Sequence, residues 1–309
     1  MQENTNIGLV VRVTGSEVWV VVGGEMVPCR LRGKLRLKKR AFQVVAGDRV
    51  RVRRLDAGGK AWAVEDLEAR DSWLSRYIER DGVERVIVAN VDRLYVVATL
   101  VSPPANNGFV DRVLVSAERG GVSASVLLNK IDLVGKDDIE RFSGLYTTCG
   151  YPVLLTSALT GEGVDALNDD LGSGVYAFVG ESGVGKSSLL MSIDPALDLK
   201  VRELGEKTGR GRHTTTFSQL YRFGAGYLTD TPGLQTFGFA GTDKTELGDC
   251  FPEFESHTAS CRFHPCTHSH EPDCGVKRAV EDEVIHRTRY RSYLNILAEV
   301  EARGKRPSR

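Results

Sequence analysis

A glycine-rich segment at residues 180–187 has the spacing G-x-x-x-x-G-K-S of a P-loop, which binds the phosphates of a nucleotide. Glycines in such a loop let backbone amides surround phosphate oxygens, while Lys186 reaches the terminal phosphates and the Ser187 hydroxyl ligates Mg²⁺. The segment follows an apolar run and precedes a helical pattern, which is the context that this motif requires. The predicted phosphate-binding residues here are Gly180, Glu181, Ser182, Gly183, Val184, Gly185, Lys186, Ser187 and Ser188.

A second motif reads Asp-Thr-Pro-Gly at residues 230–233 and follows a predicted strand at residues 226–229. An acidic side chain at the end of that strand holds Mg²⁺ directly or through water. Asp230 is therefore a predicted magnesium ligand beside Ser187, and Gly233 completes the predicted phosphate-binding set.

Two further motifs predict that the base of the nucleotide is guanine. The sequence Asn-Lys-Ile-Asp ends a predicted strand, and its Asp132 carboxylate accepts hydrogen bonds from guanine N1–H and N2–H₂, a donor pair that adenine lacks. The sequence Thr-Ser-Ala-Leu ends the next strand, where the backbone N–H of Ala158 meets guanine O6. A P-loop ATPase is the alternative interpretation. The predicted guanine-binding residues are Asn129, Lys130, Asp132, Ser157 and Ala158.

Apolar runs that alternate with helical patterns must position these motifs. Strands are expected at residues 94–100, 125–128, 153–156, 175–179 and 226–229. Helices are expected at residues 109–119, 137–147, 164–171 and from 186 onward. Continuous apolar strands separated by helices indicate a parallel sheet covered on both faces, which binds its ligand at the carboxyl ends of the strands.

The region before this α/β pattern is short-stranded and basic. Residues 30–54 carry eleven Lys and Arg residues against one acid, Asp48, which favours a nucleic-acid partner because phosphate neutralisation releases counterions. Strands are expected at residues 18–22 and 48–53, and the second alternates bases with valines, so one sheet face is basic and the other apolar. A small OB-type barrel fits this pattern. The alternative is an ordinary β-domain with a solvated basic face.

Four cysteines fall between residues 250 and 274, and three of them form a set with one histidine in the spacing C-x₄-C-x-H-x₅-C. A Cys₃His set is a closed tetrahedral site suited to structural Zn²⁺, with no position left for a catalytic water. His270 is the alternative to His268, and His264 and Cys250 are spare candidates. The predicted zinc ligands are Cys261, Cys266, His268 and Cys274.

Composition limits the remaining possibilities. The chain has 309 residues, of which 41% are hydrophobic and 27% charged, so collagen, coiled coil and general disorder are excluded. Lys and Arg balance Asp and Glu at 41 each, so net charge says nothing about partners. No apolar run reaches the roughly 20 residues of a membrane span, and the first residues do not read as a secretion signal. We expect a cytoplasmic monomer in which Cys29 and Cys149 are core residues.

The nucleotide motifs together resemble those of translation-factor-like GTPases, but in a different order. Those proteins usually place the P-loop first, whereas here the Asn-Lys-x-Asp and Ser-Ala motifs precede it. The chain is therefore similar to a circularly permuted GTPase, in which residues 172–174 join the last helix of the usual order to its first strand. The sheet is unchanged by such an exchange of connections.

With its basic OB-like start and its Cys/His cluster, the chain resembles the RsgA (YjeQ) family of ribosome small-subunit-dependent GTPases over nearly its whole length. The resemblance implies that residues 209–216 are switch I, whose threonine closes over Mg²⁺ and the γ-phosphate; by the family pattern this is Thr215, with Thr214 as the alternative. It also implies a role in late maturation of the small subunit, with rRNA contact, stimulated hydrolysis and release.

The residues around the γ-phosphate predict slow hydrolysis by the chain alone. Ras-like GTPases orient water with a glutamine directly after the Asp-x-x-Gly glycine, but here that residue is Leu234, and Gln235 comes one position late. His213 is the predicted residue to position or deprotonate water, with contact to RNA or solvent as the alternative. A different class of function is an RNA-binding assembly factor that uses GTP as a conformational ligand with negligible turnover. The predicted catalytic residues are His213, Lys186 and Thr215.

The predicted fold class is α/β, with a circularly permuted P-loop GTPase domain between an N-terminal OB-type β-barrel and a C-terminal zinc-binding, mainly helical domain. We expect the OB-type barrel at residues 1–72, the GTPase domain with a leading linker at residues 73–238, and the zinc-binding domain at residues 239–309. A C-terminal helix is expected at about residues 281–303, with acids early and bases late as the helix dipole favours, before a basic tail that contacts RNA. Because residues 230–233 lead into this region, loss of the γ-phosphate is expected to act on it directly.

Overall fold

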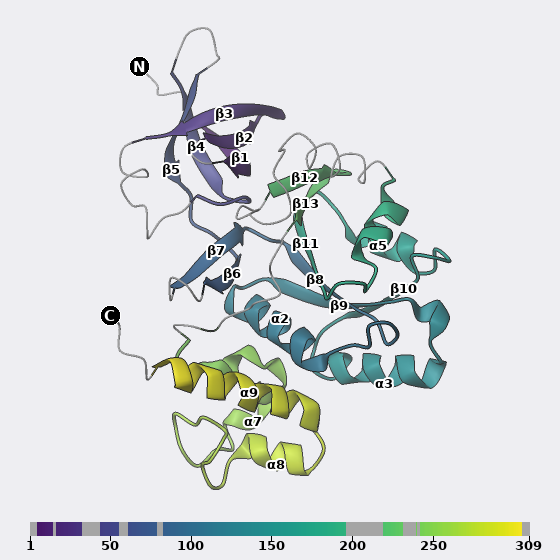
Figure 1. Cartoon of the computed structure of the whole chain (residues 1–309). Helices are drawn as coiled ribbons and strands as arrows, with labels where there is room; N and C mark the ends of the chain where they lie inside the picture. The colour runs from purple at the N-terminus through teal and green to yellow at the C-terminus, as the bar shows by residue number, and fades with distance from the viewer. Residues whose placement is uncertain are drawn as a thin grey trace.

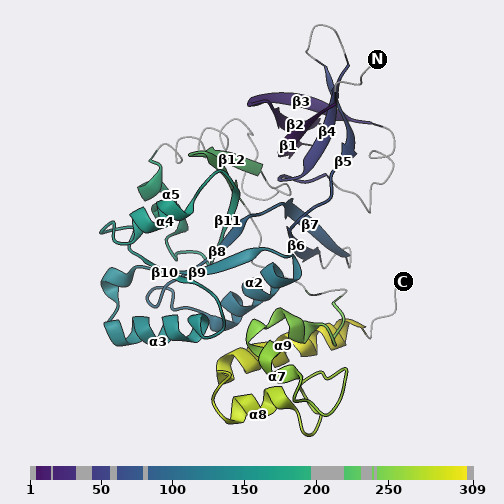
Figure 2. The same ribbon diagram turned by 180° about the vertical axis from the view of Figure 1, so that it is seen from behind.

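The structure is a computed structural model with three regions arranged from top to bottom in Figure 1, a β-barrel, an α/β sheet and a helical C-terminal region. The view from behind in Figure 2 gives the same order. No described helix is long and apolar enough to cross a membrane. The structure describes residues 5–14, 17–32, 44–55, 61–78, 83–195, 219–230, 239 and 242–304.

The N-terminal region is a closed five-stranded barrel, as an OB-type start predicts. Its strands pair in the order β1-β2-β3-β5-β4, and β4 returns to pair with β1. Val50 and Val52 of β4 are buried in the barrel core, which confirms the predicted alternation of valines and arginines. The strand bounds are β1 Thr5–Thr14, β2 Glu17–Val22, β3 Glu25–Leu31, β4 Arg49–Arg54 and β5 Trp62–Leu67.

The arginines on the outer face of the barrel are paired with acids of neighbouring segments. Arg51 lies 2.5 Å from Asp66, and Arg53 lies 2.9 Å from Glu65. These acids come from β5, the antiparallel partner of β4. The positive charge on the outer face of β4 is therefore largely neutralised by acids of the same protein. The count of charged residues at 30–54 did not predict this neutralisation.

A two-stranded antiparallel hairpin connects the barrel to the α/β region. Its strands are β6, Trp73–Ile78, and β7, Val83–Ala89. A bridge between Ala46 and Val88 links the hairpin back to the barrel segment before β4. The hairpin is therefore in contact with both regions.

The α/β region contains a sheet in the order β10-β9-β8-β11-β13-β12, parallel except for the antiparallel strand β12. Helices cover both faces, as the alternation of apolar runs and helical patterns predicts. The strands are β8 Arg93–Ala98, β9 Ser123–Asn129, β10 Val153–Thr156, β11 Val175–Val179, β12 Gln219–Phe223 and β13 Gly226–Asp230. The helices are α2 Asn107–Arg119, η1 Ile131–Leu133, α3 Lys136–Thr147, α4 Val164–Asp170 and α5 Lys186–Ile193.

The barrel and the α/β sheet are joined edge to edge. Strand β12 pairs with β1 through Arg12 and Gln219, so the two regions form one sheet of 11 strands. Gln219 also pairs with Asp230 at the end of β13. The barrel therefore begins two strands away from the predicted magnesium ligand.

The C-terminal region packs on α2 through a long final helix, as both views show. The single helix expected at residues 281–303 is wrong in its start, because α8 ends at Glu281 and α9 begins at Arg287. Glu283 has a φ of 60°, and the amide of Val284 donates back to the oxygen of Ala279, which ends α8 in a turn. The early acids therefore do not stabilise the start of α9. The elements are η2 Leu247–Cys250, η3 Pro252–Phe254, α7 Glu255–Thr258, α8 Gly275–Glu281 and α9 Arg287–Gly304.

Candidate nucleotide and metal sites

The P-loop connects β11 to α5 at the carboxyl edge of the sheet. Gly185 has a φ of 93°, and a Cβ atom at this position would lie 2.4 Å from the side-chain nitrogen of Asn129. Only glycine meets both conditions, since other residues rarely adopt this conformation and would collide with Asn129. Ser187 and Ser188 lie in the first turn of α5, where exposed backbone amides favour anions.

Lys186 folds back onto its own loop. Its Nζ donates hydrogen bonds to the main-chain oxygens of Gly180 and Glu181, at 2.7 and 2.8 Å. Burial lowers the pKa of Lys186 from its ordinary value, although the neighbouring Glu181 acts in the opposite direction. If Lys186 binds phosphates as its motif predicts, its ammonium group has to exchange these two carbonyl oxygens for phosphate oxygens.

The Asn-Lys-Ile-Asp motif is bonded directly to the P-loop. Asn129, at the end of β9, donates from its side-chain amide to the oxygen of Val184 at 2.9 Å. Lys130 donates from Nζ to the oxygens of Gly183 and Ser102, each at 2.8 Å. Two motifs that lie 55 positions apart in the chain therefore form one arrangement of loops.

The loop after β10 completes this arrangement. The Ser157 hydroxyl donates to the Asp132 carboxylate at 2.5 Å, and so holds the predicted guanine acceptor in place. The Ala158 amide, which is expected to meet guanine O6, donates here to Oδ1 of Asn129 at 3.2 Å. The structure thus brings together all the predicted guanine residues and the P-loop at one edge of the sheet, the edge where open α/β sheets bind ligands.

The described residues do not include the whole predicted site. Asp230 ends β13, which puts its backbone at the same edge of the sheet as the P-loop. Its side chain, together with His213, Thr215 and Gly233, lies outside the described residues. The segment after β8 also contacts the candidate nucleotide site, which was not predicted from sequence. Its Ser102 main-chain oxygen accepts a hydrogen bond from Lys130. Its only sequence signal is a Ser-Pro-Pro run after a strand end.

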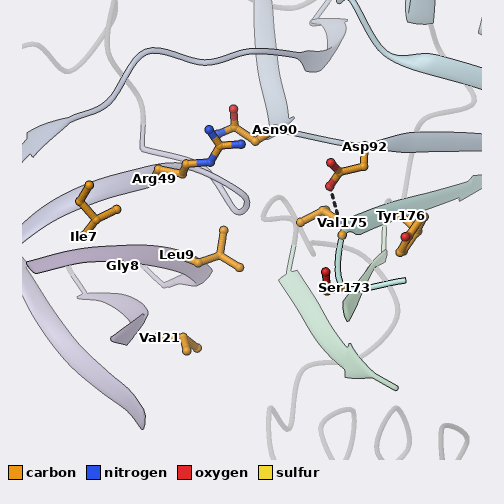
Figure 3. Close-up of a pocket in the computed structure, with 11 residues that line it drawn as sticks. Ile7, Gly8, Leu9, Val21, Arg49, Asn90, Asp92, Ser173, Val175 and Tyr176 are labelled. Atoms are coloured by element: carbon orange, nitrogen blue, oxygen red, sulfur yellow. Dashed lines mark hydrogen bonds between the residues drawn. The ribbon is translucent and has the colours of Figure 1, made fainter. Parts of the chain in front are cut away.

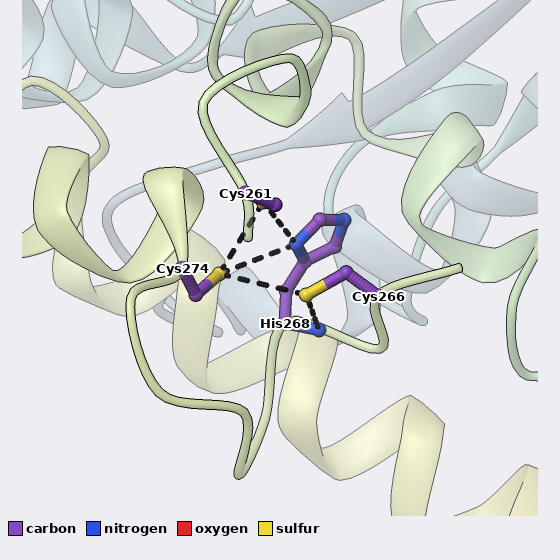
Figure 4. Close-up of side chains that lie close together, drawn as sticks. All are labelled: Cys261, Cys266, His268 and Cys274. Carbon is purple, nitrogen blue, oxygen red and sulfur yellow. Dashed lines mark hydrogen bonds between the residues drawn. The ribbon is translucent and has the colours of Figure 1, made fainter. Parts of the chain in front are cut away.

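The predicted zinc ligands form a compact buried cluster in the C-terminal region (Figure 4). The ligand atoms of the four residues lie within 4.8 Å of one another. Sγ of Cys261 and Sγ of Cys274 are 3.7 Å apart, and Nδ1 of His268 lies 3.3 Å from the latter. A tetrahedral zinc ion with Zn–S bonds of about 2.3 Å places its sulfurs roughly 3.8 Å apart, so this donor set fits Zn²⁺.

The surroundings of the cluster suit a structural metal. Burial lowers the pKa of His268, which keeps its imidazole neutral and able to bind a metal. The amides of Gly275 and His268 donate to the sulfurs of Cys261 and Cys266, as charged thiolates require. The Tyr290 hydroxyl donates to the His268 carbonyl at 2.7 Å. His270, the alternative ligand, is bonded instead to the Ser269 hydroxyl and lies outside the cluster.

A separate hollow of about 680 Å³ lies between the barrel and the α/β sheet. Figure 3 shows Ile7, Leu9 and Arg49 on the barrel side, facing Asp92 and Val175 on the other. Asp92 accepts a hydrogen bond from the Val175 amide at 2.7 Å. The hollow borders the amino ends of β8 and β11, the edge opposite the P-loop, so it is not part of the candidate nucleotide site.

The parallel sheet, the P-loop and the guanine-type loops in this chain order define a circularly permuted P-loop GTPase. The family model described as RsgA GTPase matches residues 67–240. The chain belongs to the RsgA GTPase family, which confirms the resemblance inferred from its sequence.

Named relatives support the same assignment across the whole chain. The protein named small ribosomal subunit biogenesis GTPase RsgA from Bacteroides fragilis is 38% identical, over 95% of this chain and 97% of the relative. The protein of the same name from Gemmatimonas aurantiaca is also 38% identical, over 96% and 98%.

Solved structures extend the similarity to three dimensions. YjeQ from Thermotoga maritima aligns with a TM-score of 0.78 at 33% identity, over 98% of this chain and all of the other. YloQ, described as a circularly permuted GTPase, aligns with a TM-score of 0.74 at 26% identity, over 100% and 99%.

Proposed function

We propose that the chain hydrolyses GTP at the loops after β9, β10 and β11, and acts in biogenesis of the small ribosomal subunit. The hydrogen bond from Asn129 to Val184 carries the proposal most directly, because it joins a guanine-type motif to a P-loop. The names of the relatives support the ribosomal part. A cytoplasmic monomer in contact with small-subunit rRNA completes the proposal.

Each motif has a separate task in binding GTP. The Asp132 carboxylate accepts from guanine N1–H and N2–H₂, and Ser157 keeps that carboxylate oriented. The Ala158 amide turns from Asn129 to guanine O6. The P-loop amides and Lys186 hold the phosphates, since backbone donors and a lysine favour the negative charge that develops there. Gly233 contributes a further amide at the γ-phosphate.

Mg²⁺, when bound with GTP, neutralises charge on the β- and γ-phosphates. Ser187, Asp230 and Thr215 would hold it. Ser187 in the first turn of α5 and Asp230 at the end of the parallel neighbour β13 support this assignment. The family pattern supports Thr215.

The site lacks a glutamine at the usual water-orienting position, where Leu234 stands. We assign that task to His213 and expect slow hydrolysis until the small subunit completes the geometry, followed by release of the protein in late maturation. The same leucine favours a second candidate, an RNA-binding assembly factor that uses GTP as a conformational ligand with negligible turnover.

We assign residues 1–72 to RNA binding, 73–238 to GTP hydrolysis and 239–309 to a zinc-stabilised docking domain. Zn²⁺, when bound, cross-links the segment that carries its ligands. The compact Cys₃His cluster and its amide donors support that assignment.

GTP turnover by the full chain with small subunits, large subunits or no partner, across a salt series, tests the proposal. We expect stimulation by small subunits only, weakening as salt rises. Turnover that stays negligible with every partner favours the second candidate. His213→Ala should leave GTP affinity near normal and lower stimulated turnover by about 10²-fold or more, the usual contribution of an acid–base group. His257→Ala, on α7, is the matched control.

A further inference from the structure

The outer face of the barrel carries a row of residues that begins at the hollow between the barrel and the α/β sheet. Arg49, Leu9, Val21 and Met26 lie directly opposite one another on β4, β1, β2 and β3. These four strands span about 14 Å, since neighbouring strands lie about 4.8 Å apart. Val20, which precedes Val21 on β2, is fully buried in the barrel core, so the row points outward.

The side chains of this face are mostly apolar and reach the solvent. Met26 is 55% exposed, and Ile7, two positions before Leu9 on β1, is 65% exposed. Leu9 and Val21 are half-buried and line the hollow together with Ile7 (Figure 3). Single exposed apolar residues are common, but a contiguous apolar surface beside a hollow marks an interaction site.

The charge that remains at the hollow is negative. Arg49, the base that lines it, is already paired with Asp71 at 2.7 Å. Asp92, across the hollow, is exposed and forms no ion pair within the described part of the chain. One oxygen of its carboxylate accepts from the Val175 amide, which leaves the other oxygen to accept from a partner. The hollow therefore favours a cationic group.

This combination fits a protein segment better than RNA. Proteins that bind single-stranded RNA stack its nucleobases on aromatic rings and pair its phosphates with basic side chains. Here the exposed side chains are aliphatic, the arginine is neutralised, and Asp92 repels phosphates. The ring of Trp19, on the same outer face, is covered by the guanidinium of Arg12, 4.7 Å from its centroid. Aliphatic side chains beside an uncompensated carboxylate match an apolar segment that carries a lysine or an arginine.

The hollow has room for such a side chain. Its volume of about 680 Å³ lies within the range of roughly 300–1,000 Å³ in which protein pockets hold small ligands. A lysine or arginine that enters can lay its aliphatic stem against Leu9 and Val21 and place its charged end at Asp92. The apolar row continues beyond the hollow to Met26, so the surface fits a partner longer than one side chain.

We propose that the face formed by Ile7, Leu9, Val21 and Met26, with the adjoining hollow, docks an apolar segment of a small-subunit protein whose lysine or arginine pairs with Asp92. The proposal rests on the proposed function, which supplies the small subunit as the partner. It adds a protein contact to a barrel that is otherwise assigned to RNA. A segment docked there contacts the barrel and the GTPase sheet at once.

Site-specific photocrosslinking of the full chain to purified small subunits tests the proposal. A benzophenone amino acid in place of Ile7 or Met26 should crosslink to a small-subunit protein, at a segment that contains lysine or arginine, as identified by mass spectrometry. The same amino acid in place of Val284, which is 63% exposed in the C-terminal region, is the control and should not give that product. Crosslinks from the barrel positions to RNA alone, to a protein segment without a basic residue, or to no component would overturn the proposal.

Two substitutions separate the charged contact from the apolar one. Asp92→Asn keeps an oxygen that accepts from the Val175 amide but removes the charge, and Ile7→Gln removes apolar surface at an exposed position. Each should weaken binding of small subunits by about fivefold or more, the loss typical of an important contact residue, and leave GTP turnover without subunits unchanged. Asp165→Asn, at an exposed acid of α4, is the matched control and should bind normally.

The same measurements separate this proposal from the proposed function. Unchanged affinity in Asp92→Asn or in Ile7→Gln would overturn the docking proposal while stimulated GTP turnover stays intact. An unmodified chain that neither binds small subunits nor is stimulated by them would show that the proposed function fails, and the docking proposal with it.

Discussion

Asn129 donates a hydrogen bond from its side-chain amide to the main-chain oxygen of Val184 across 2.9 Å, and this contact joins the end of β9 to the P-loop. The backbone amide of Ala158 donates a second hydrogen bond, to Oδ1 of the same asparagine. One side chain therefore links the ends of β9, β10 and β11, which carry the candidate nucleotide site. Its position explains why the Asn-Lys-Ile-Asp motif begins with an amide, which can donate and accept at once.

Replacing Asp132 by asparagine should remove the preference for guanine. The amide offers one acceptor and a donor where the carboxylate accepts from two guanine N–H groups, and each lost charged hydrogen bond weakens binding by about tenfold or more. We expect GTP affinity to fall and affinity for xanthosine triphosphate to rise. Competition binding with GTP, xanthosine triphosphate and ATP measures both changes. Asp137→Asn, an exposed acid in the first turn of α3, is the control and should bind GTP normally. Unchanged GTP preference in the Asp132 variant would contradict the assignment.

The two histidines near the metal cluster should behave differently. His268→Ala removes a ligand from the set of four and should lose the bound zinc, because a three-ligand site no longer encloses the ion. His270→Ala should keep one zinc per chain, since His270 is not in the cluster. Metal content and thermal unfolding, each with and without a chelator, measure both effects. Equal zinc loss in the two variants would contradict the assignment of His268 as the histidine ligand.

Arg289→Met should destabilise the protein strongly. The guanidinium is fully buried between Asp111 and Glu253, each at 2.7 Å, so its loss leaves buried carboxylates without a partner. The free energy of unfolding should fall by about 3–5 kcal/mol in denaturant titrations. Arg287→Met removes an exposed arginine two positions away, 3.8 Å from Glu283, and should cost less than about 1 kcal/mol. Similar losses in both variants would show that the buried pairing is unimportant.

RNA affinity should depend more on the bases outside β4 than on those in it. Arg51 already contacts Asp66 at 2.5 Å and Glu68 at 3.3 Å, so it contributes little net positive charge. Lys38→Gln should therefore reduce the slope of affinity against salt concentration by about one phosphate contact, whereas Arg51→Gln should change it less. Binding of small subunits over a salt series measures the difference. A larger effect of Arg51→Gln would indicate that the arginine leaves its acids to bind RNA.

The elements that could be predicted from sequence are those in which each face lies along its whole length in one kind of environment, either core or solvent. Strands β8, β9 and β11 are continuous apolar runs because helices cover both sides. Strand β1 was not predicted, since Val10 packs in the barrel core and the adjacent Val11 packs in the core on the other side. A bulge between residues 10 and 12 also breaks its alternation. Period-two patterns do not identify such a strand.

The candidate nucleotide and metal residues stand out in the sequence because their chemistry requires particular residue types at set spacings. By contrast, no residue pattern predicts that Arg112 and Arg119 of α2 lie over the ring of Phe239, because that contact depends on tertiary packing. The pairing of Arg51 and Arg53 with acids of β5 likewise follows from strand register, which charge counting ignores. The predicted start of the last helix was wrong because the acidic run at residues 281–283 lies at a turn that ends α8, where Glu283 has a φ of 60°, and α9 begins only at Arg287.

The pairing of β1 with β12 also protects the protein from aggregation. A strand at the border of a sheet offers unpaired N–H and C=O groups, on which another chain can add by backbone hydrogen bonds. Here the neighbouring domain occupies that border through Arg12 and Gln219. A fragment that lacks the first 72 residues would expose β12 and should self-associate, so the N-terminal barrel also protects the GTPase sheet from aggregation.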